Sequence, residues 1–311
     1  MRLVFLGSGA FGTPTLEALA AAAGHEVVLV VTQPDKPAGR GKVLTPTPIA
    51  LCAERLGIRV LKPTDINEAS VRAELRGIAA DAWVVIAFGQ KLSRELLEGN
   101  FAINLHGSLL PAYRGAAPIQ RAVMDGCAET GVSVISLAER MDAGLVYATR
   151  VRPIGPRATS DEVHDLLSTL GPEVIEDVLA RRRAGTLVGV VQDESKATRA
   201  RKLSKAEATV DLTQLDAPSV RARVNGLNAW PGCTVLIGEL PVKLLRVDVC
   251  ATSTNEPGVL RADGKVDARS GAIEILEVQP LGKRAMSMTE FLAGRSKLVG
   301  ERLRPMMAAE A

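Results

Sequence analysis

Hydrophobic and polar positions follow two different patterns along the chain, and the pattern changes near residue 200. Over the first 180 residues, short apolar runs alternate with stretches of helical spacing, as expected for a parallel sheet covered by helices. The predicted strands are residues 3–6, 27–32, 59–61, 82–87, 101–105, 132–137 and 146–153. The predicted helices include residues 13–23, 47–56 and 68–76. We therefore expect an α/β fold, a Rossmann-like, mostly parallel sheet with helices on both faces.

A longer helix is predicted to begin near Thr159 and to run toward residue 183. Thr159 and Glu162 have the spacing of a capping box, in which each side chain binds the other's backbone amide. Gly171 and Pro172 are expected to break this helix in the middle, because proline cannot continue the backbone hydrogen bonding.

From about residue 206 the chain predicts short strands separated by Gly, Pro, Asp and Asn turns. These strands are residues 233–237, 242–249, 258–261 and 272–279, which is typical of a small β-barrel or sandwich. The boundary falls in the basic stretch 192–205, so the predicted domains are 1–190 and 206–311, joined by a linker at 191–205.

Composition and charge narrow the class of protein. The chain of 311 residues is 47% hydrophobic, enough for a full core, and no apolar run reaches the roughly 20 residues that span a bilayer. Residues 1–7 have too short an apolar run for a signal peptide. The cysteines are scattered, which argues against a disulfide framework or a zinc site and suits a reducing cytoplasm: Cys52, Cys127, Cys233 and Cys250.

The net charge of +3 is concentrated in one segment. Residues 181–205 carry eight Lys and Arg against two Asp and Glu. This segment is either a solvated linker or a contact for a polyanion. An aromatic content of 3% argues against an RNA-binding module that works by base stacking.

The candidate chemistry centres on Asn104 and His106, which follow the apolar residues 101–103. Residues two apart on a strand point to the same side, so these side chains are expected to face one space. An amide donor and an imidazole at a strand end suit acyl transfer, with one stabilising an oxyanion and the other moving a proton. The alternative is that both side chains only satisfy nearby backbone groups.

Three other motifs admit two interpretations each. Gly7, Gly9 and Gly12 match the dinucleotide-binding pattern, although the acidic residue expected after the second strand comes late, so they also fit a simple tight turn. The basic loop 36–42 is a phosphate-contacting finger or an ordinary surface loop. Asp142 is a turn residue, or the carboxylate that orients His106 and favours its charged form.

The run 104–111 with the following 114–118 resembles the signature of the formyltetrahydrofolate-dependent formyltransferases. Further matches at 32–42, 129–132, 202–205, 279–284 and 291–294 extend the resemblance over essentially the whole chain. The loop 36–42 and a C-terminal barrel favour the branch that acts on methionyl-tRNA over the branch that acts on glycinamide ribonucleotide. The family usually has Thr-Pro where this chain has Ser8-Gly9, and this departure creates the apparent dinucleotide motif.

The resemblance implies an enzyme that moves the formyl group of 10-formyltetrahydrofolate to the α-amine of methionyl initiator tRNA for translation initiation, without a metal. It implies a catalytic set of Asn104, His106 and Asp142. It implies a folate-lining segment of Ser108, Leu109, Leu110 and Pro111. It implies tRNA contacts at Lys36, Arg40 and Lys42, and a C-terminal OB-type β-barrel that helps to hold the tRNA. We expect a monomer in the bacterial cytoplasm.

Three alternatives remain open from the sequence. They are a formyltransferase for a small amine acceptor, an NAD-dependent oxidoreductase using the glycine turn, and a tRNA-binding protein without catalytic activity. The run 104–111 argues against the last two.

Overall fold

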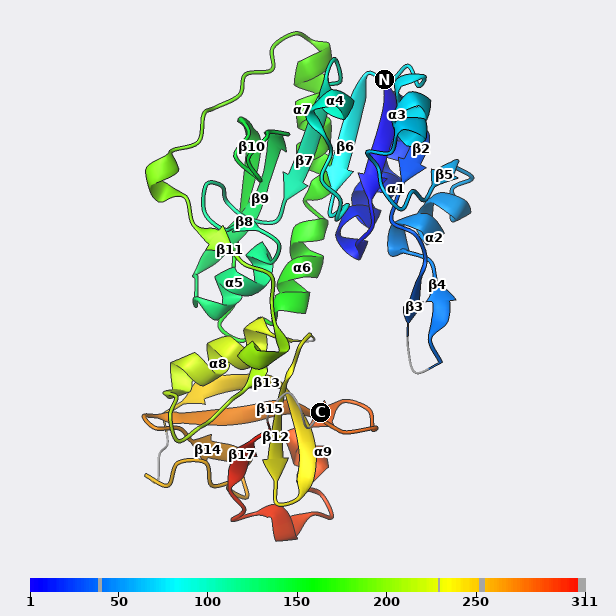
Figure 1. Ribbon diagram of the computed structural model, residues 1–311. Helices are drawn as coiled ribbons and strands as arrows, with labels where there is room; N and C mark the ends of the chain where they lie inside the picture. The colour runs from blue at the N-terminus through cyan, green and yellow to red at the C-terminus, as the bar shows by residue number, and fades with distance from the viewer. Residues whose placement is uncertain (39–40, 229, 252–254, 307–311) are drawn as a thin grey trace. The chain divides into compact units, whose positions relative to one another are not determined.

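The computed structural model describes residues 1–38, 41–228, 230–251 and 255–306 (Figure 1). The chain divides into two units that interleave along the sequence. Unit 1 comprises Met1–Gly115, Gly131–Arg152 and His164–Arg199, and unit 2 comprises Ala116–Thr130, Pro153–Val163 and Ala200–Ala311. The predicted limits 1–190, 191–205 and 206–311 stay predictions.

A seven-stranded sheet forms the centre of unit 1, in the order β10-β9-β7-β6-β1-β2-β5. Its strands are β1 Arg2–Gly7, β2 Glu26–Val31, β5 Val60–Leu61, β6 Ala82–Ile86, β7 Ala102–His106, β9 Glu129–Ser136 and β10 Val146–Pro153. The pairs β1–β2, β1–β6, β2–β5 and β6–β7 are parallel, whereas β7–β9 is antiparallel. The mostly parallel sheet predicted from the sequence is therefore confirmed.

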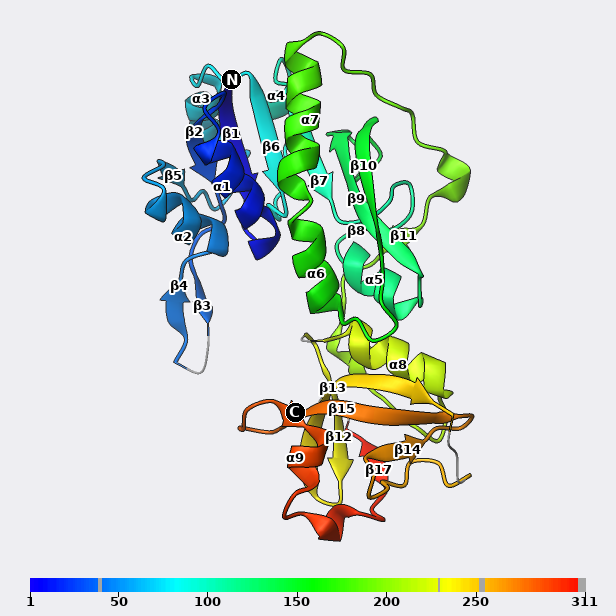
Figure 2. The same cartoon turned by 180° about the vertical axis from the view of Figure 1, so that it is seen from behind.

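Helices cover both faces of this sheet, which explains why its central strands β1, β2 and β6 are apolar runs rather than alternating ones. The helices are α1 Thr13–Ala21, α2 Pro48–Arg55, α3 Ala69–Arg76, α4 Arg94–Leu97, α6 Ser160–Ser168 and α7 Gly171–Arg183. Val4 and Leu6 pack with Leu75 of α3 and Leu96 of α4. Phe5 points to the opposite face, where α1 and α7 pack against each other (Figure 2).

The two predicted features of the long helix are confirmed. Thr159 and Glu162 exchange hydrogen bonds, with the Thr159 amide 3.0 Å from Glu162 Oε2 and the Glu162 amide 3.4 Å from Thr159 Oγ1. The helix is interrupted between α6 and α7, because α7 begins at Gly171 with Pro172 in its first turn.

The glycine turn after β1 is explained by packing, so its resemblance to a dinucleotide site carries little weight. A Cβ on Gly7 would lie 2.8 Å from the Phe5 ring and 2.9 Å from the Ile86 carbonyl oxygen. A Cβ on Gly12 would lie within 3.3 Å of Ile49 and Ile86. Asp35, the late acidic residue, is paired with Lys62 at 2.8 Å. Because these glycines have no side chain, the turn after β1 packs closely against the sheet.

Unit 2 is built on a curled antiparallel sheet, an open half-barrel consistent with the expected OB-type fold. Its strands are β12 Cys233–Ile237, β13 Leu240–Cys250, β14 Lys265–Asp267, β15 Ala272–Pro280, β16 Met286–Ser287 and β17 Leu303–Pro305. The helix α8 Ala217–Gly226 packs on β13 and on α5 Pro118–Met124, and α9 Met288–Leu292 packs on β15.

Two local expectations were wrong. Residues 258–261 form no strand but only isolated bridges at Val259 and Leu260, because Gly258 has a φ of +84° that interrupts an extended run. The predicted loop at 36–42 is largely a hairpin, in which β3 Lys36–Ala38 pairs antiparallel with β4 Val43–Thr45. Residues 39–40 lie outside the described residues.

Candidate active site

β7 brings two of the predicted catalytic side chains to one face of the sheet. Asn104 lies beside Val85 of β6 and Ile135 of β9, and His106 is the last residue of the strand. Because side chains alternate along a strand, Asn104 and His106 share a face while Ile103 and Leu105 enter the core on the other. The site thus lies where β7 ends.

The hydrogen bonding of His106 assigns different roles to its two ring nitrogens. His106 is buried, with 6% of its surface exposed, and its Nε2 lies 2.9 Å from the Tyr113 carbonyl oxygen. A carbonyl oxygen only accepts, so Nε2 carries the proton of this bond. Nδ1 lies 3.7 Å from Oδ2 of Asp142, a distance for an ion pair rather than a direct hydrogen bond. Nδ1 is therefore the nitrogen available to gain or lose a proton.

The amide of Asn104 is uncommitted in the described residues. Asn104 is partly exposed, and no hydrogen bond joins its side chain to another residue in that part of the chain. Its NH2 group can therefore donate to a bound molecule without first breaking a bond inside the protein.

Asp142 lies in residues 141–144, which we call the Asp142 loop. Its Oδ2 accepts a hydrogen bond from the Gly115 amide at 2.9 Å, which turns the carboxylate toward His106. The loop closes tightly onto β9, since a Cβ on Gly144 would lie 1.8 Å from the Ser136 carbonyl oxygen. The Leu145 amide also donates to Ser136 Oγ at 2.9 Å.

The segment predicted to line a folate, Ser108 to Pro111, is fixed from both sides. Ser108 Oγ donates to the Ala112 carbonyl at 2.6 Å. Ser133 of β9 donates to the Ser108 carbonyl at 2.8 Å and accepts from the Leu110 amide at 3.1 Å. Since the Ser108 hydroxyl is engaged within its own turn, this segment presents the partly exposed Leu109 and Pro111 rather than a free hydroxyl, while Leu110 is buried.

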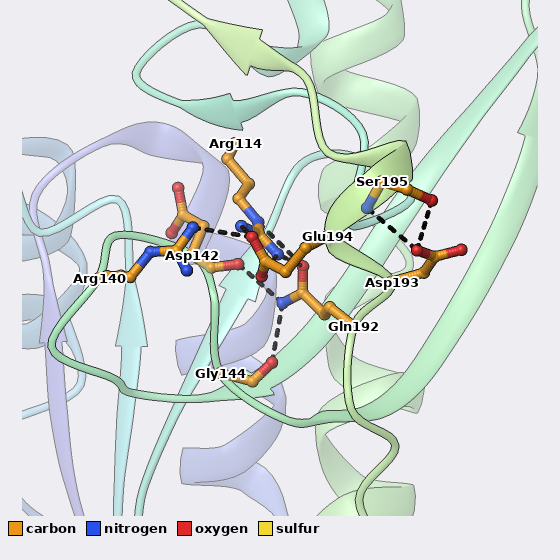
Figure 3. Close-up of polar contacts among 8 residues, drawn as sticks. All are labelled: Arg114, Arg140, Asp142, Gly144, Gln192, Asp193, Glu194 and Ser195. Atoms are coloured by element: carbon orange, nitrogen blue, oxygen red, sulfur yellow. Dashed lines mark hydrogen bonds and ion pairs between the residues drawn. The ribbon is translucent and has the colours of Figure 1, made fainter.

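A polar cluster that the sequence did not predict surrounds Arg114, and Figure 3 shows its members. The Arg114 guanidinium donates to Oε1 of Gln192 at 3.0 and 2.7 Å and to both carboxylate oxygens of Glu194 at 3.1 and 2.8 Å. Arg140 donates to Glu194 at 2.8 Å. Hydrogen bonds from Arg114 and then Arg140 lower the pKa of the Glu194 carboxyl to about 2.

Gln192 and Glu194 lie in the segment after α7, which the sequence placed in a basic linker. Asp193 accepts from the Ser195 amide at 3.0 Å and from its hydroxyl at 2.6 Å, and so starts a short 3-10 helix at Glu194–Lys196 (Figure 3). Arg114 belongs to the signature run, which singles it out in the sequence, but its burial and hence its need for acceptors are seen only in the structure. The sequence does not say which residues supply them.

The predicted tRNA-contacting residues are only partly described. Lys36 on β3 and Lys42 before β4 are exposed, and Lys36 Nζ donates to Gln33 Oε1. Arg40 lies outside the described residues. Within the described ranges, no group of three or more His, Cys, Asp or Glu side chains is arranged to hold a metal ion. No helix in the same ranges is both long and apolar enough to cross a membrane.

Comparison with known proteins identifies both halves of the chain. Residues 1–179 match the model of the formyl transferase family, and residues 202–296 match its C-terminal domain. The methionyl-tRNA formyltransferase of Roseobacter denitrificans is 42% identical over 297 residues, covering 94% of this chain and 96% of the relative. That of Moorella thermoacetica is 38% identical and covers 97% and 98%.

Solved structures agree at the level of the fold. HypX from Aquifex aeolicus in complex with tetrahydrofolic acid aligns with a TM-score of 0.64 at 19% identity, covering 96% of this chain and 48% of HypX. The N-formyltransferase of Helicobacter canadensis, with folinic acid and dTDP-3-aminofucose, aligns with a TM-score of 0.69 at 12% identity, covering 90% and 99%. With family models on both halves and relatives alike over nearly their whole length, this chain belongs to the formyltransferase family.

Proposed function

We propose that this protein transfers the formyl group of 10-formyltetrahydrofolate to the α-amino group of methionyl initiator tRNA. The observation that carries the proposal is the likeness to methionyl-tRNA formyltransferases at 38–42% identity over 94–97% of the chain. The HypX structure with bound tetrahydrofolic acid supports a folate as the donor. An NAD-dependent oxidoreductase is not favoured, since the glycines of its motif serve packing.

The reaction joins an amine to a formyl carbon and releases a folate nitrogen. The α-amine attacks the carbonyl carbon of the formyl group, and the carbon–oxygen double bond becomes a tetrahedral oxyanion. The C–N bond to N10 of the folate then breaks as N10 takes up the proton that the amine gives up. The site must therefore stabilise an oxyanion and carry one proton from nitrogen to nitrogen.

Asn104, His106 and Asp142 supply these two needs. The amide of Asn104, which has no side-chain partner among the described residues, donates to the oxyanion together with Nδ1–H of a protonated His106. The Asp142 carboxylate, 3.7 Å from Nδ1, faces that nitrogen as its charged partner. The 3.7 Å between His106 Nδ1 and Asp142 Oδ2 is too long for a direct hydrogen bond. The substrate amine, or a water molecule between His106 and Asp142, therefore passes the proton.

The remaining predicted contacts complete the proposal. Ser108, Leu109, Leu110 and Pro111, held by Ser133, line the folate site. Lys36 and Lys42 of the β3–β4 hairpin, together with Arg40, contact phosphates of the tRNA; Arg40 enters on its sequence alone, since it lies outside the described residues. Unit 2 helps to hold the tRNA as an OB-type domain. The protein acts as a monomer in the bacterial cytoplasm.

A comparison of three acceptors tests the proposal. The purified protein is mixed with 10-formyltetrahydrofolate and, in separate reactions, charged initiator tRNA, charged elongator methionyl-tRNA and a small amino sugar nucleotide. We expect formylmethionine on the initiator tRNA and little product from the other two acceptors. Formylation of the amino sugar alone would replace the tRNA by a small amine, and failure with every acceptor would overturn formyl transfer itself.

A further inference from the structure

We propose that Gln192 is a positioning residue that holds the Asp142 carboxylate beside His106. The inference rests on the proposed function for the role of Asp142, while the geometry of Gln192 stands independently of it. Gln192 is 7% exposed and lies in the segment after α7, whereas its partners are Arg114, in the two-residue strand β8 Arg114–Gly115, and the Asp142 loop that follows β9. Figure 3 shows these side chains around Gln192.

The side-chain amide of Gln192 makes four hydrogen bonds, two donated by Nε2 and two accepted by Oε1. Nε2 donates to the Asp142 carbonyl at 2.8 Å and to the Gly144 carbonyl at 2.8 Å. Oε1 accepts both bonds from Arg114. Because arginine only donates and carbonyl oxygens only accept, the amide has one possible orientation, and a glutamate at this position lacks the donors.

The Asp142 loop needs such support. Asp142 has a φ of +53°, in the left-handed region that side-chain-bearing residues rarely adopt. The two bonds from Gln192 hold the carbonyls on either side of Ala143, and so fix the turn that carries Asp142. Without them, the strained loop can relax and move the carboxylate away from Nδ1 of His106.

Arg114 connects this support to the carboxylate itself. Its side chain binds Oε1 of Gln192, while the amide of the next residue, Gly115, donates to Oδ2 of Asp142 at 2.9 Å. Glu194 holds the guanidinium from its other side through two oxygens. One cluster thus fixes both parts of the Asp142 loop. Gln192 holds its backbone, and the Gly115 amide, next to Arg114, holds the carboxylate.

The first test separates positioning from a general loss of stability. Gln192→Met keeps the length of the side chain and removes its hydrogen bonds. Gln192→Glu keeps the acceptors for Arg114 but replaces the donors to the loop by a charged oxygen, which repels the Asp142 and Gly144 carbonyls. We expect both to lower kcat about 10- to 100-fold, the effect of a small misplacement of a catalytic group, with the folate KM within about 2-fold.

Asn100→Leu is the matched control, since it removes an amide–carbonyl bond of 3.0 Å to Leu96 near the opposite end of β7. It is expected to lower the melting temperature without changing kcat. A Gln192→Glu enzyme with the wild-type kcat would overturn the proposal, because the bonds to the loop would then be dispensable.

A double-mutant cycle shows whether Gln192 acts through Asp142. In an Asp142→Asn background the charge to be positioned is already gone, so adding Gln192→Met is expected to lower kcat no further. A second loss as large as that of Gln192→Met alone would mean that Gln192 acts independently of Asp142, which contradicts the proposal.

A measurement without turnover distinguishes failure of this inference from failure of the proposed function. The Gly115 amide donates to the Asp142 carboxylate, so its hydrogen exchange, followed by NMR, reports whether that carboxylate is in place. We expect Gln192→Met to speed exchange at Gly115 and to leave the amide of Phe5 in β1 protected. Unchanged protection at Gly115 would refute the positioning role even if the wild-type protein transferred no formyl group.

Discussion

At the scale of single residues, the site consists of one uncommitted amide and one imidazole whose two nitrogens have different partners. Asn104 has no side-chain partner within the described residues, and His106 gives its Nε2 proton to a backbone carbonyl. Both groups are presented near the end of a buried strand, and the strand fixes the positions of their backbones. Such prepared donors stabilise a developing oxyanion without reorganising during the reaction.

Replacing the donor of Asn104 is expected to lower kcat about 10²–10³-fold, the usual effect of removing one hydrogen-bond donor to an oxyanion. Asn104→Asp tests this with the least change of shape, because it replaces the NH2 group by an acceptor. The measurement is kcat at saturating 10-formyltetrahydrofolate and charged tRNA, and the melting temperature is the control for folding. A well-folded variant with near-normal kcat would exclude Asn104 from oxyanion stabilisation.

Glu194 predicts how stability depends on pH. Its pKa is about 2 in the folded protein against an ordinary 4.5, because Arg114 and Arg140 bind its charged form. A carboxyl whose pKa is lowered by folding stabilises the protein above its unfolded pKa, and this stabilisation disappears as the pH falls from about 4.5 to about 2.

Glu194→Gln is therefore expected to be less stable than the wild type at neutral pH, with the difference shrinking as the pH falls through that window. Urea unfolding at a series of pH values measures this difference. Glu98→Gln, which removes one exposed carboxylate outside the cluster, is the control. A wild-type–variant difference that stays constant from about pH 6 to about pH 2 would contradict the assignment.

The sequence predicted the candidate site residues that lie close together along the chain and missed those that only folding brings together. Asn104 and His106 are two residues apart, so strand periodicity was enough to place them on one face. Gln192 lies 50 residues from Asp142 and 78 from Arg114, and no local pattern links such positions. The sequence showed a basic stretch there, and a count of charges gives no signal for a neutral residue such as Gln192.

At the scale of elements, strands of five to eight residues were predicted well, because an alternation between the two faces can be recognised over that length even where no face is fully buried. The predicted strands 146–153 and 233–237 coincide with β10 and β12. The strands β14 and β16 are three and two residues long and were missed, since a period of two cannot be recognised over so few positions. The helix α8 was missed too, although Asp216 caps it by accepting from the Ser219 amide at 2.9 Å.

The packing of α8 against α5 depends on a glycine, which gives a prediction for unit 2. A Cβ on Gly226 would lie 2.4 Å from Met124 Cγ and 3.0 Å from the Met124 amide nitrogen. Since a backbone atom cannot move aside cheaply, Gly226→Ala is expected to lower the free energy of unfolding by about 1–3 kcal/mol.

Gly155→Ala is the matched control, because nothing lies within 4 Å of the Cβ that it would add and its φ is not positive. Urea denaturation of both variants measures the difference. Equal stability of the two variants would mean that α5 and α8 do not need the close approach at Gly226.

At the scale of the whole molecule, the chain carries cations on a hairpin of unit 1 and its candidate chemistry at the end of β7. Lys36 and Lys42 lie on the β3–β4 hairpin and are exposed. The formyl transferase family models cover both halves of the chain. A run of Lys, Gly and Arg does not encode the geometry by which one tRNA is recognised among many. The sequence therefore predicted the charge of this segment but not that it forms a hairpin.

Removing the hairpin cations is expected to weaken the use of tRNA more than the chemistry. Lys36→Ala/Lys42→Ala should lower kcat/KM for charged tRNA and flatten the dependence of log(kcat/KM) on log salt, by about 0.7–0.9 for each phosphate that the variant no longer neutralises. Arg2→Ala/Arg59→Ala, which removes two exposed cations at the amino ends of β1 and β5, is the control. An unchanged salt slope in the Lys36/Lys42 variant would mean that these hairpin cations do not contact the tRNA.

The most direct test of formyl transfer by this site is a single-turnover reaction of labelled 10-formyltetrahydrofolate with charged initiator tRNA, with the wild type beside Asp142→Asn. We expect the wild type to place the label on the methionine α-amine. We expect Asp142→Asn, folded and still accepting from the Gly115 amide, to lose most of the rate. A wild type that leaves the label on the folate, or an Asp142→Asn variant that transfers it as fast, would contradict the proposed function and its mechanism.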